Sequence, residues 1–172
     1  MRATILCWFL AVTISNAFAQ TQPLSKPCST NPEYRQFDFW LGEWEVYAVS
    51  GNRAGQSKIS MILDSCIILE EWTGSGGFTG KSFNTWNAAK RQWQQTWVDN
   101  VGGTTHFLSG KSEPDKITFL ADNEVDRDGK SFKRKLTFYK LSNEKVRQHG
   151  ERSNDGGQRW TTEYDLEYRK KK

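Results

Sequence analysis

The sequence predicts an all-β protein that folds as an antiparallel up-and-down barrel of about ten strands. From Gly42 onward, short segments of alternating apolar and polar residues recur, and turn-forming clusters such as 74–77 and 154–157 separate them. No amphipathic stretch as long as three helical turns occurs in the sequence, so no crossover helices are expected between the strands. Successive hairpins without crossovers form an up-and-down sheet, and closing that sheet into a barrel removes its exposed edges.

The first 19 residues predict a cleaved export signal. Arg2 precedes an apolar run over 3–12, and Ala17-Phe18-Ala19 provides the small residues that signal peptidase accepts. The apolar run is too short to cross a hydrocarbon core of about 30 Å, so we expect no membrane span. The sequence therefore predicts a periplasmic or secreted product.

An extended N-terminal arm is expected over 20–36, followed by a single barrel domain over 37–172. The arm contains three prolines that disfavour regular structure, Pro23, Pro27 and Pro32. A short helical turn is expected around 34–40, just before the first strand. The 153 residues that remain after removal of the signal (172 minus 19) suit one domain with a substantial core.

The mature chain keeps two cysteines, Cys28 and Cys66, because Cys7 lies in the signal. An even pair in an exported protein favours one disulfide over a metal site. The two histidines of the sequence, His106 and His149, have no ligand spacing to a cysteine or a carboxylate cluster, so no metal site is expected. We expect a disulfide that joins the N-terminal arm to the barrel.

Alternation and turn residues place the strands, and two hairpins also predict which residues face each other. The strands are expected near 43–49, 57–64, 66–73, 80–87, 92–99, 104–110, 116–122, 132–141, 145–153 and 158–168. In the first hairpin the expected opposite pairs are Trp86–Trp93, Asn84–Gln95, Ser82–Trp97 and Gly80–Asp99. In the second they are Glu151–Trp160, His149–Thr162 and Arg147–Tyr164. These residues are assigned to the inner face of the barrel.

The stretch Phe37-Asp38-Phe39-Trp40-Leu41-Gly42-Glu43-Trp44 resembles the opening of lipocalin-like (calycin) barrels, in which a Gly-x-Trp step begins the first strand. It is more closely similar to a family of uncharacterised exported bacterial proteins that open with this motif. The similarity extends to 80–86, 95–99, 146–148 and 151–160. The second and third conserved regions of lipocalins have no clear match, so the resemblance is to the wider calycin group.

This resemblance implies a barrel in which Gly42, Trp44 and Trp40 have structural roles at the closed end. In such barrels a basic residue of the last strand covers the tryptophan of the first strand. The resemblance implies that Arg169 takes this role, with Arg147 as the alternative.

The lumen is expected to bind a small, partly apolar molecule. Barrels of this size are either filled by their own side chains or hold one small ligand. Polar groups inside a barrel cost about 1 to 3 kcal/mol each when unpaired, so they need partners or a ligand. Arg147 is the candidate receptor for a carboxylate or another anionic head. The candidate ligand-binding residues are Asn84, Trp86, Gln95, Trp97, Asp99, Arg147, His149, Glu151, Trp160 and Tyr164.

Two other functions remain alternatives. One is a small enzyme of isomerase or lyase type that uses Asp99 and Glu151 as general acid and base, although no known catalytic motif supports it. The other is a structural or interaction module with a filled lumen. No cofactor is expected, except that haem bound through His149, as in nitrobindin-like barrels of the calycin group, is an alternative.

The charge of the chain does not indicate a nucleic-acid partner. Removing Arg2 with the signal leaves 23 basic side chains (24 minus 1) and 20 acidic ones, a formal charge of +3. Such a mild excess, without basic residues interleaved with aromatic ones, does not predict nucleic-acid binding. We expect a monomer or a homodimer whose partner is a small-molecule ligand.

Overall fold

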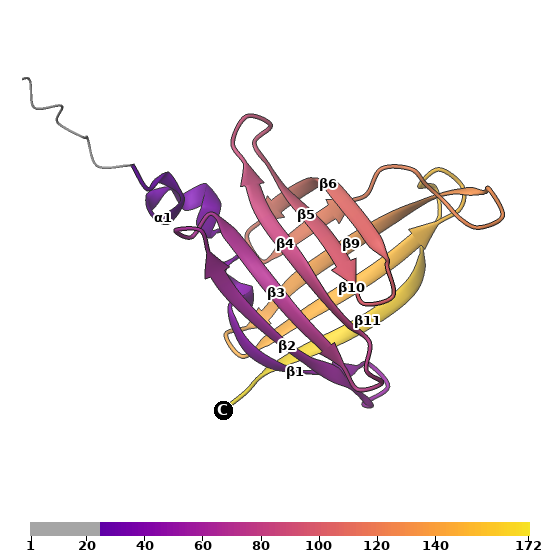
Figure 1. Cartoon of the computed structure of the whole chain (residues 1–172), viewed down its shortest axis with the longest axis horizontal. Helices are drawn as coiled ribbons and strands as arrows, with labels where there is room; N and C mark the ends of the chain where they lie inside the picture. Colours follow the sequence, from indigo (N-terminus) through magenta and orange to yellow (C-terminus); the bar gives the residue numbers. More distant parts are fainter. Residues whose placement is uncertain (1–24) are drawn as a thin grey trace, which may run out of the picture.

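The computed structural model describes residues 25–172, which form a closed antiparallel barrel of ten strands (Figure 1). The expected export signal over 1–19 lies outside the described residues. Neighbouring strands follow the order of the chain, and the barrel closes where the first strand pairs with the last. The barrel strands are β1 (Gly42–Ala48), β2 (Arg53–Ile62), β3 (Ile67–Gly74), β4 (Thr79–Asn87), β5 (Gln92–Asp99), β6 (Thr104–Glu113), β7 (Lys116–Leu120), β9 (Ser131–Ser142), β10 (Lys145–Ser153) and β11 (Thr161–Lys170).

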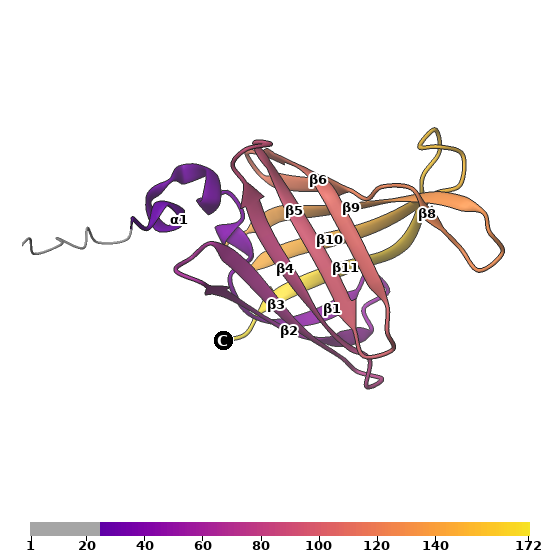
Figure 2. The same cartoon turned by 45° about the horizontal axis from the view of Figure 1, so that its top comes forward.

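One further strand, β8 (Glu124–Val125), lies outside the barrel wall. It pairs with Ser131 and Phe132 at the start of β9, beyond the part of β9 that pairs with β7. Figure 2 shows β8 and its loop projecting from one end of the barrel. The expected up-and-down barrel of about ten strands is confirmed. The last strand begins at Thr161 rather than near 158.

The two expected hairpin registers have different outcomes. The β4–β5 register is confirmed, with Trp86 opposite Trp93 and Asn84 opposite Gln95. The β10–β11 register is wrong, because Glu151 faces Thr162 and the register shifts again between Gly150 and Glu151. This bulge adds one residue, Glu163, to β11, and a shift by one residue moves every following side chain to the other face.

The N-terminal arm is helical where the sequence predicts extended chain. It contains α1 (Pro27–Thr30) and η1 (Pro32–Arg35), followed by η2 (Asp38–Trp40) at the expected helical turn. Proline opens both of the first two turns, and it is compatible with the first helical position because its missing N–H has no partner there. The side chain of Asn31 accepts a hydrogen bond from the backbone N–H of Glu33 at 3.0 Å and caps η1.

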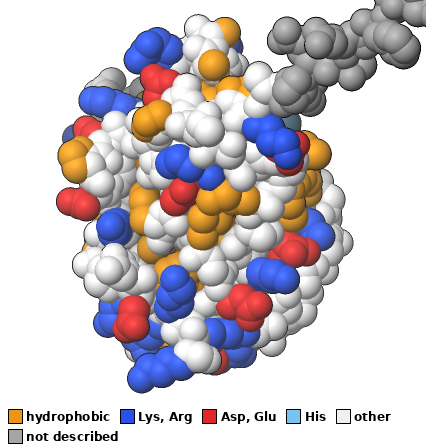
Figure 3. Space-filling model, turned by 90° about the vertical axis from the view of Figure 1, so that its left-hand side faces the viewer, with side chains coloured by type: hydrophobic (Ala, Val, Ile, Leu, Met, Phe, Trp, Pro, Cys, Tyr) orange, Lys and Arg blue, Asp and Glu red, His pale blue; other side chains and the backbone are white. Residues whose placement is uncertain are grey.

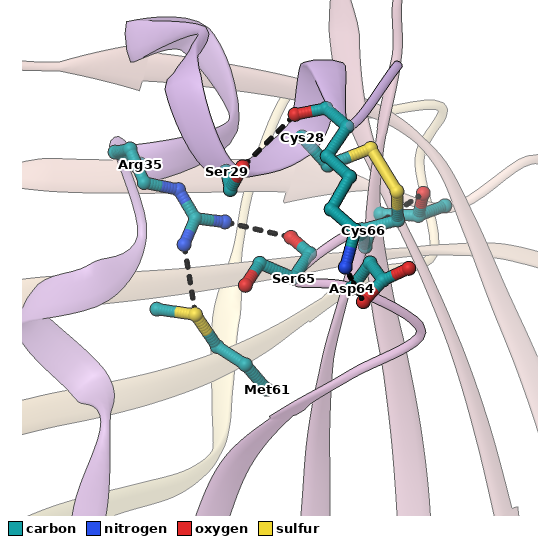
Figure 4. The surroundings of a disulfide bond; sticks show 9 residues. Cys28, Ser29, Arg35, Met61, Asp64, Ser65 and Cys66 are labelled. Carbon is teal, nitrogen blue, oxygen red and sulfur yellow. Dashed lines mark hydrogen bonds and ion pairs between the residues drawn. A yellow bond between two sulfur atoms is a disulfide. The ribbon is translucent and has the colours of Figure 1, made fainter. Parts of the chain in front are cut away.

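The expected disulfide between Cys28 and Cys66 is confirmed, and it ties the helical arm to the turn between β2 and β3 (Figure 4). Two polar contacts reinforce this junction. Arg35 donates a hydrogen bond from Nη2 to the backbone oxygen of Ser65 at 2.7 Å, and Lys26 lies 3.1 Å from Asp64. The arm is therefore fixed to the barrel by covalent and polar contacts that are far apart in sequence.

An aromatic core fills the half of the lumen next to this arm, which we call the closed end. Phe37 and Trp40 enter the barrel from the arm and pack on Phe138, with ring centroids 4.9 and 4.4 Å away. Trp44 is fully buried and donates from Nε1 to the backbone oxygen of Trp40 at 2.8 Å. Figure 3 views this end, where hydrophobic side chains gather near the centre of the face between charged side chains of both signs.

Lys170, not Arg169, is the basic residue beside Trp44. Trp44 and Lys170 are cross-strand partners on β1 and β11, and Lys170 Nζ lies 5.6 Å from the centre of the indole ring. The next residue, Arg169, points to the other face and packs over the ring of Tyr47 at 4.3 Å. Gly42 allows this arrangement, since its φ of +132° disfavours other residues and a Cβ there would lie 3.1 Å from Lys170 Cε.

Candidate functional site

The half of the lumen away from the arm, which we call the open half, is not filled. Inward side chains recur at every second residue, so each strand runs from the packed core into this half. On β3 the inward series is Ile68, Glu70 and Trp72, and on β5 it is Trp93, Gln95, Trp97 and Asp99. The first residue of each series belongs to the core, and the others line a cavity of about 530 Å³.

The lining of this cavity changes from its floor to its mouth. The floor, next to the aromatic core, is made by Glu70, Gln95, Gln148 and Tyr168. Apolar side chains form the wall above it, namely Phe107, Leu136 and Leu166. The mouth combines aromatic, polar and charged residues, which are Trp72, Phe78, Trp97, Asp99, Gly103, Thr104, Thr105, Arg134, Glu163 and Tyr164.

Glu70 is the centre of a buried hydrogen-bond network in the floor. Its side chain is 2% exposed and accepts hydrogen bonds from Ser57 Oγ at 3.0 Å and from Ser82 Oγ at 2.9 Å. The hydroxyl of Tyr168 lies 3.2 Å from Glu70 Oε1 and 2.8 Å from Gln148 Oε1. The five side chains come from β2, β3, β4, β10 and β11, so the network joins five of the ten barrel strands.

The environment of Glu70 raises the pKa of its carboxyl from 4.5 to about 7. Burial is the main cause, and the hydrogen bonds from Ser82, Ser57 and Tyr168 partly oppose it. Within residues 25–172, no basic side chain forms an ion pair with Glu70. The cavity floor therefore holds a carboxyl that changes charge near neutral pH and has no counter-ion of its own.

Asn84 extends the floor network but does not line the cavity. It is fully buried and donates from Nδ2 to the backbone oxygen of Ile68 and to Ser82 Oγ, both at 3.0 Å. Its own oxygen accepts a hydrogen bond from Gln95 Nε2 at 2.7 Å. Asn84 thus holds Ser82 and Gln95 in place beneath the cavity.

The charged groups at the mouth are already paired. Arg134 Nη1 lies 2.7 Å from Glu124, and Arg134 Nε lies 3.0 Å from Glu163. Asp99 accepts hydrogen bonds from the backbone N–H groups of Gly103 at 2.8 Å and of Val101 at 3.1 Å. The bond from Gly103 is the main reason why the pKa of Asp99 lies below its usual value. The charged side chains of the mouth are therefore held in place by ion pairs and by backbone hydrogen bonds.

Two aromatic rings narrow the mouth. The ring centroids of Phe78 and Trp97 are 6.3 Å apart, and Trp97 Nε1 donates to Asp99 Oδ2 at 3.3 Å. The indole ring of Trp97 lies directly over Gly80 of β4, where a Cβ would overlap the ring. Glycine at this position therefore sets how closely Trp97 approaches the wall and how much of the cavity stays open.

The expected site residues fall into three groups in the structure. Gln95, Trp97, Asp99 and Tyr164 line the cavity as expected. Asn84 and Trp86 are buried beside the core, where Trp86 packs on Trp93 with ring centroids 6.2 Å apart. The remaining four do not line the cavity, and they are Arg147, His149, Glu151 and Trp160.

The inner-face assignment of these four residues is wrong because of the shifted β10–β11 register. The outer face of β10 instead carries a row of polar pairs. Arg147 binds Asp165 through two nitrogens at 2.6 and 2.7 Å. His149 Nε2 lies 3.0 Å from Thr162 Oγ1, Glu151 lies 2.9 Å from Lys135, and Trp160 packs under Lys135 at 4.4 Å. The inward positions of β10 are Val146, Gln148 and Gly150.

Sequence reasoning missed Glu70, the residue on which the floor network depends. The signal that identifies it is the confirmed β4 register together with the turn at 74–77, which sets Glu70 opposite Ser82 on the inner face. Its neighbour Glu71 faces outward and lies 2.9 Å from Lys81. Two adjacent glutamates on one strand point to opposite faces of the sheet. In a barrel whose inner face is buried, one of the two is therefore buried.

No metal-ligand group of three or more His, Cys, Asp or Glu side chains occurs in the part of the chain that the structure describes. Since His149 lies on the outer face, its imidazole does not point into the lumen where a haem would bind. Over residues 25–172 no helix has the length and apolar character needed to cross a membrane. No protein-family model matches the chain, and the comparison with curated proteins found no match.

Proposed function

We propose that the protein is an exported small-molecule-binding barrel that holds one partly apolar ligand in the open half of its lumen. The cavity of about 530 Å³ is the observation on which this proposal depends. Its volume lies within the range of about 300 to 1,000 Å³ that is usual for small-molecule sites, and such sites combine apolar walls with a few polar groups. The Cys28–Cys66 disulfide supports export, because disulfides persist in oxidising compartments.

The contrast between the two halves of the lumen argues against a purely structural module. The closed end is packed with aromatic rings that include Phe37, Trp40, Trp44 and Phe138, all of them fully buried. A module with no ligand would gain stability by filling the open half in the same way. Instead, the open half keeps a cavity with a polar floor and a carboxyl that has no counter-ion.

The alternative function, an enzyme with Asp99 and Glu151 as general acid and base, has no geometric support. Asp99 lies at the cavity mouth, whereas Glu151 lies on the outer face of β10 in a pair with Lys135. The two carboxylates therefore do not face a common substrate. A binding function requires no such pair, and the geometry of the cavity supports it better.

The proposal is tested by native mass spectrometry of protein purified from its own cells, followed by a binding assay with the neutral aromatic dye N-phenyl-1-naphthylamine. We expect either a bound small molecule at one copy per chain or dye binding at one site. Thr105→Trp fills the mouth and should abolish dye binding, whereas Thr96→Trp adds the same ring on the outer face of β5 and should not. An empty wild-type protein that also excludes the dye would refute the proposal.

A further inference from the structure

We propose that the cavity selects organic cations, with an ammonium group seated beside Glu70 at the floor and an apolar body held between the aromatic walls. This inference deepens the proposed function and rests on it. It replaces the expectation of an anionic head group bound to Arg147, since Arg147 lies on the outer face and binds Asp165. Three features of the cavity support it: its charge, the hydrogen bonds of Glu70 and its aromatic lining.

The charges that line the cavity are predominantly acidic. Glu70, Asp99 and Glu163 provide three carboxyl groups, and Arg134 is the one basic lining residue within the described part of the chain. Arg134 already contacts two carboxylates, Glu163 at 3.0 Å and Glu124 at 2.7 Å. An anionic ligand would therefore find no free positive group here, whereas a cation would find carboxylates at both the mouth and the floor.

When the Glu70 carboxyl is ionised, the hydrogen-bond network around it is one proton short. The hydroxyl of Tyr168 has a single proton, yet its oxygen lies within hydrogen-bond distance of Glu70 Oε1 and of Gln148 Oε1. In the protonated state, the carboxyl donates its proton to the Tyr168 oxygen, and Tyr168 then donates to Gln148. When the carboxyl ionises, a cation from the cavity can replace the lost positive charge.

The walls above Glu70 suit a cation with an apolar body. Trp72, Trp97 and Tyr164 line the cavity on the mouth side of Glu70, and Phe78 lies beside Trp97. The faces of such rings attract ammonium groups, most strongly where water is excluded. Apolar contacts with Phe107 and Leu136 would hold the remainder of the ligand. The same rings offer no comparable attraction to a carboxylate.

Binding of a cation beside Glu70 should release a proton at neutral pH. The groups that face Glu70 are Ser57 from β2, Ser82 from β4, Gln148 from β10 and the tyrosines of β11, Tyr164 and Tyr168. Serine and glutamine do not titrate, and tyrosine ionises only near pH 10 or above. At the mouth, Glu163 is paired with Arg134, and hydrogen bonds hold the pKa of Asp99 below its usual value. Glu70 is therefore the group whose proton is exchanged for the cation.

The sign of the pH dependence follows from this exchange. A cation binds the ionised carboxylate, whose fraction rises with pH, so affinity should increase from acid to weakly alkaline solution. With half-ionisation at about pH 7, affinity is expected to be about tenfold weaker at about pH 6 than at about pH 8. A ligand recognised only by the aromatic walls would bind equally at both pH values.

The test compares three ligands of nearly equal size that differ in charge: 2-phenylethylammonium, 3-phenylpropanamide and 3-phenylpropanoate. Titration calorimetry of the wild-type protein at about pH 8 should show the ammonium ion binding at least about tenfold more tightly than the other two. Repeating the titration at about pH 7, where about half of the Glu70 carboxyl is protonated, in two buffers with different heats of protonation should reveal proton release. Equal or tighter binding of the amide or of the carboxylate would overturn the inference.

Two variants distinguish the effect of the Glu70 carboxyl on ligand binding from the effect of the negative charge on the protein surface. Glu70→Gln keeps the shape of the protonated side chain and should remove both the preference for the ammonium ion and the pH dependence. Glu71→Gln removes one negative charge from the outer face of the same strand and should change neither. A cation preference that persists in Glu70→Gln would overturn the inference. If that variant fails to fold, the measurement of proton release on the wild-type protein decides the question.

The outcomes also separate this inference from the proposed function. If N-phenyl-1-naphthylamine or the neutral amide binds but the ammonium ion has no advantage, the barrel binds ligands and only the cation selectivity is wrong. If none of the probes binds the wild-type protein, both the selectivity and the binding function are wrong.

Discussion

Replacing Glu70 with glutamine should stabilise the protein, relative to the wild type, more above neutral pH than in acid solution. The folded carboxyl has a pKa of about 7 against an ordinary value of 4.5, so the folded state holds a proton that the unfolded state releases between these pH values. Stability therefore falls as the pH rises through this window, and the loss is complete above about pH 7. One pKa unit corresponds to about 1.4 kcal/mol, so the ionised carboxylate costs about 3 kcal/mol of unfolding free energy.

Urea unfolding, followed by tryptophan fluorescence at a series of pH values, measures this cost. The unfolding free energy of Glu70→Gln minus that of the wild type should rise by about 3 kcal/mol from about pH 4 to about pH 8. Taking the difference cancels the titration of all other groups. Glu71→Gln should show no such rise, because the hydrogen bond from Lys81 lowers the pKa of the exposed Glu71 carboxyl rather than raising it. A constant difference for Glu70→Gln as well would refute the inference that Glu70 is protonated in the folded protein.

Three further substitutions test other parts of the structure. Replacing Cys28 and Cys66 together with serine should lower the unfolding free energy by about 4 kcal/mol, because the disulfide closes a loop with a sequence separation of 38; a denaturation midpoint equal to that of the oxidised wild type would contradict this. Gly80→Val should push the adjacent indole ring into the cavity and weaken dye binding about tenfold or more, whereas Gly76→Ala, which meets open space, should leave dye affinity unchanged. Arg147→Ala should leave ligand affinity within about twofold and cost less than about 1 kcal/mol in stability, since its ion pair is partly exposed; a tenfold loss of affinity would show that this arginine binds ligand after all.

The sequence predicts the barrel better than it predicts the second hairpin, and the difference has a local cause. Between β4 and β5 the loop over 88–91 is short, so its position fixes the register. Between β10 and β11 the loop is longer, and the side chains of Ser153 and Asp155 bind its backbone N–H groups, among them that of Gly157 at 2.9 Å. The longer loop and the register shift between Gly150 and Glu151 together place the expected inner residues of this hairpin on the outer face.

The floor of the site was not predicted because β3 does not alternate clearly. Ile67, Ile68 and Leu69 are consecutive apolar residues, and Glu70 and Glu71 are consecutive acidic ones, so neither face is marked by polarity. The pairing with β4 and β2 decides which glutamate is buried, and this pairing is a property of the whole barrel. Strands usually carry apolar residues on their buried face, so a buried carboxyl without a counter-ion departs from this pattern. Such departures are expected at functional sites.

The two ends of the barrel divide stability and binding between them. The disulfide, the helical arm and the aromatic core all lie at the closed end, where burial of Trp40, Trp44 and Phe138 stabilises the fold. The open half contains the destabilising element, since ionised Glu70 costs about 3 kcal/mol in the empty cavity. A bound cation would remove much of that cost, so ligand affinity and the instability of the empty site have the same origin. Substitutions of the open half that relieve this cost, such as Glu70→Gln, should therefore stabilise the barrel and weaken cation binding together.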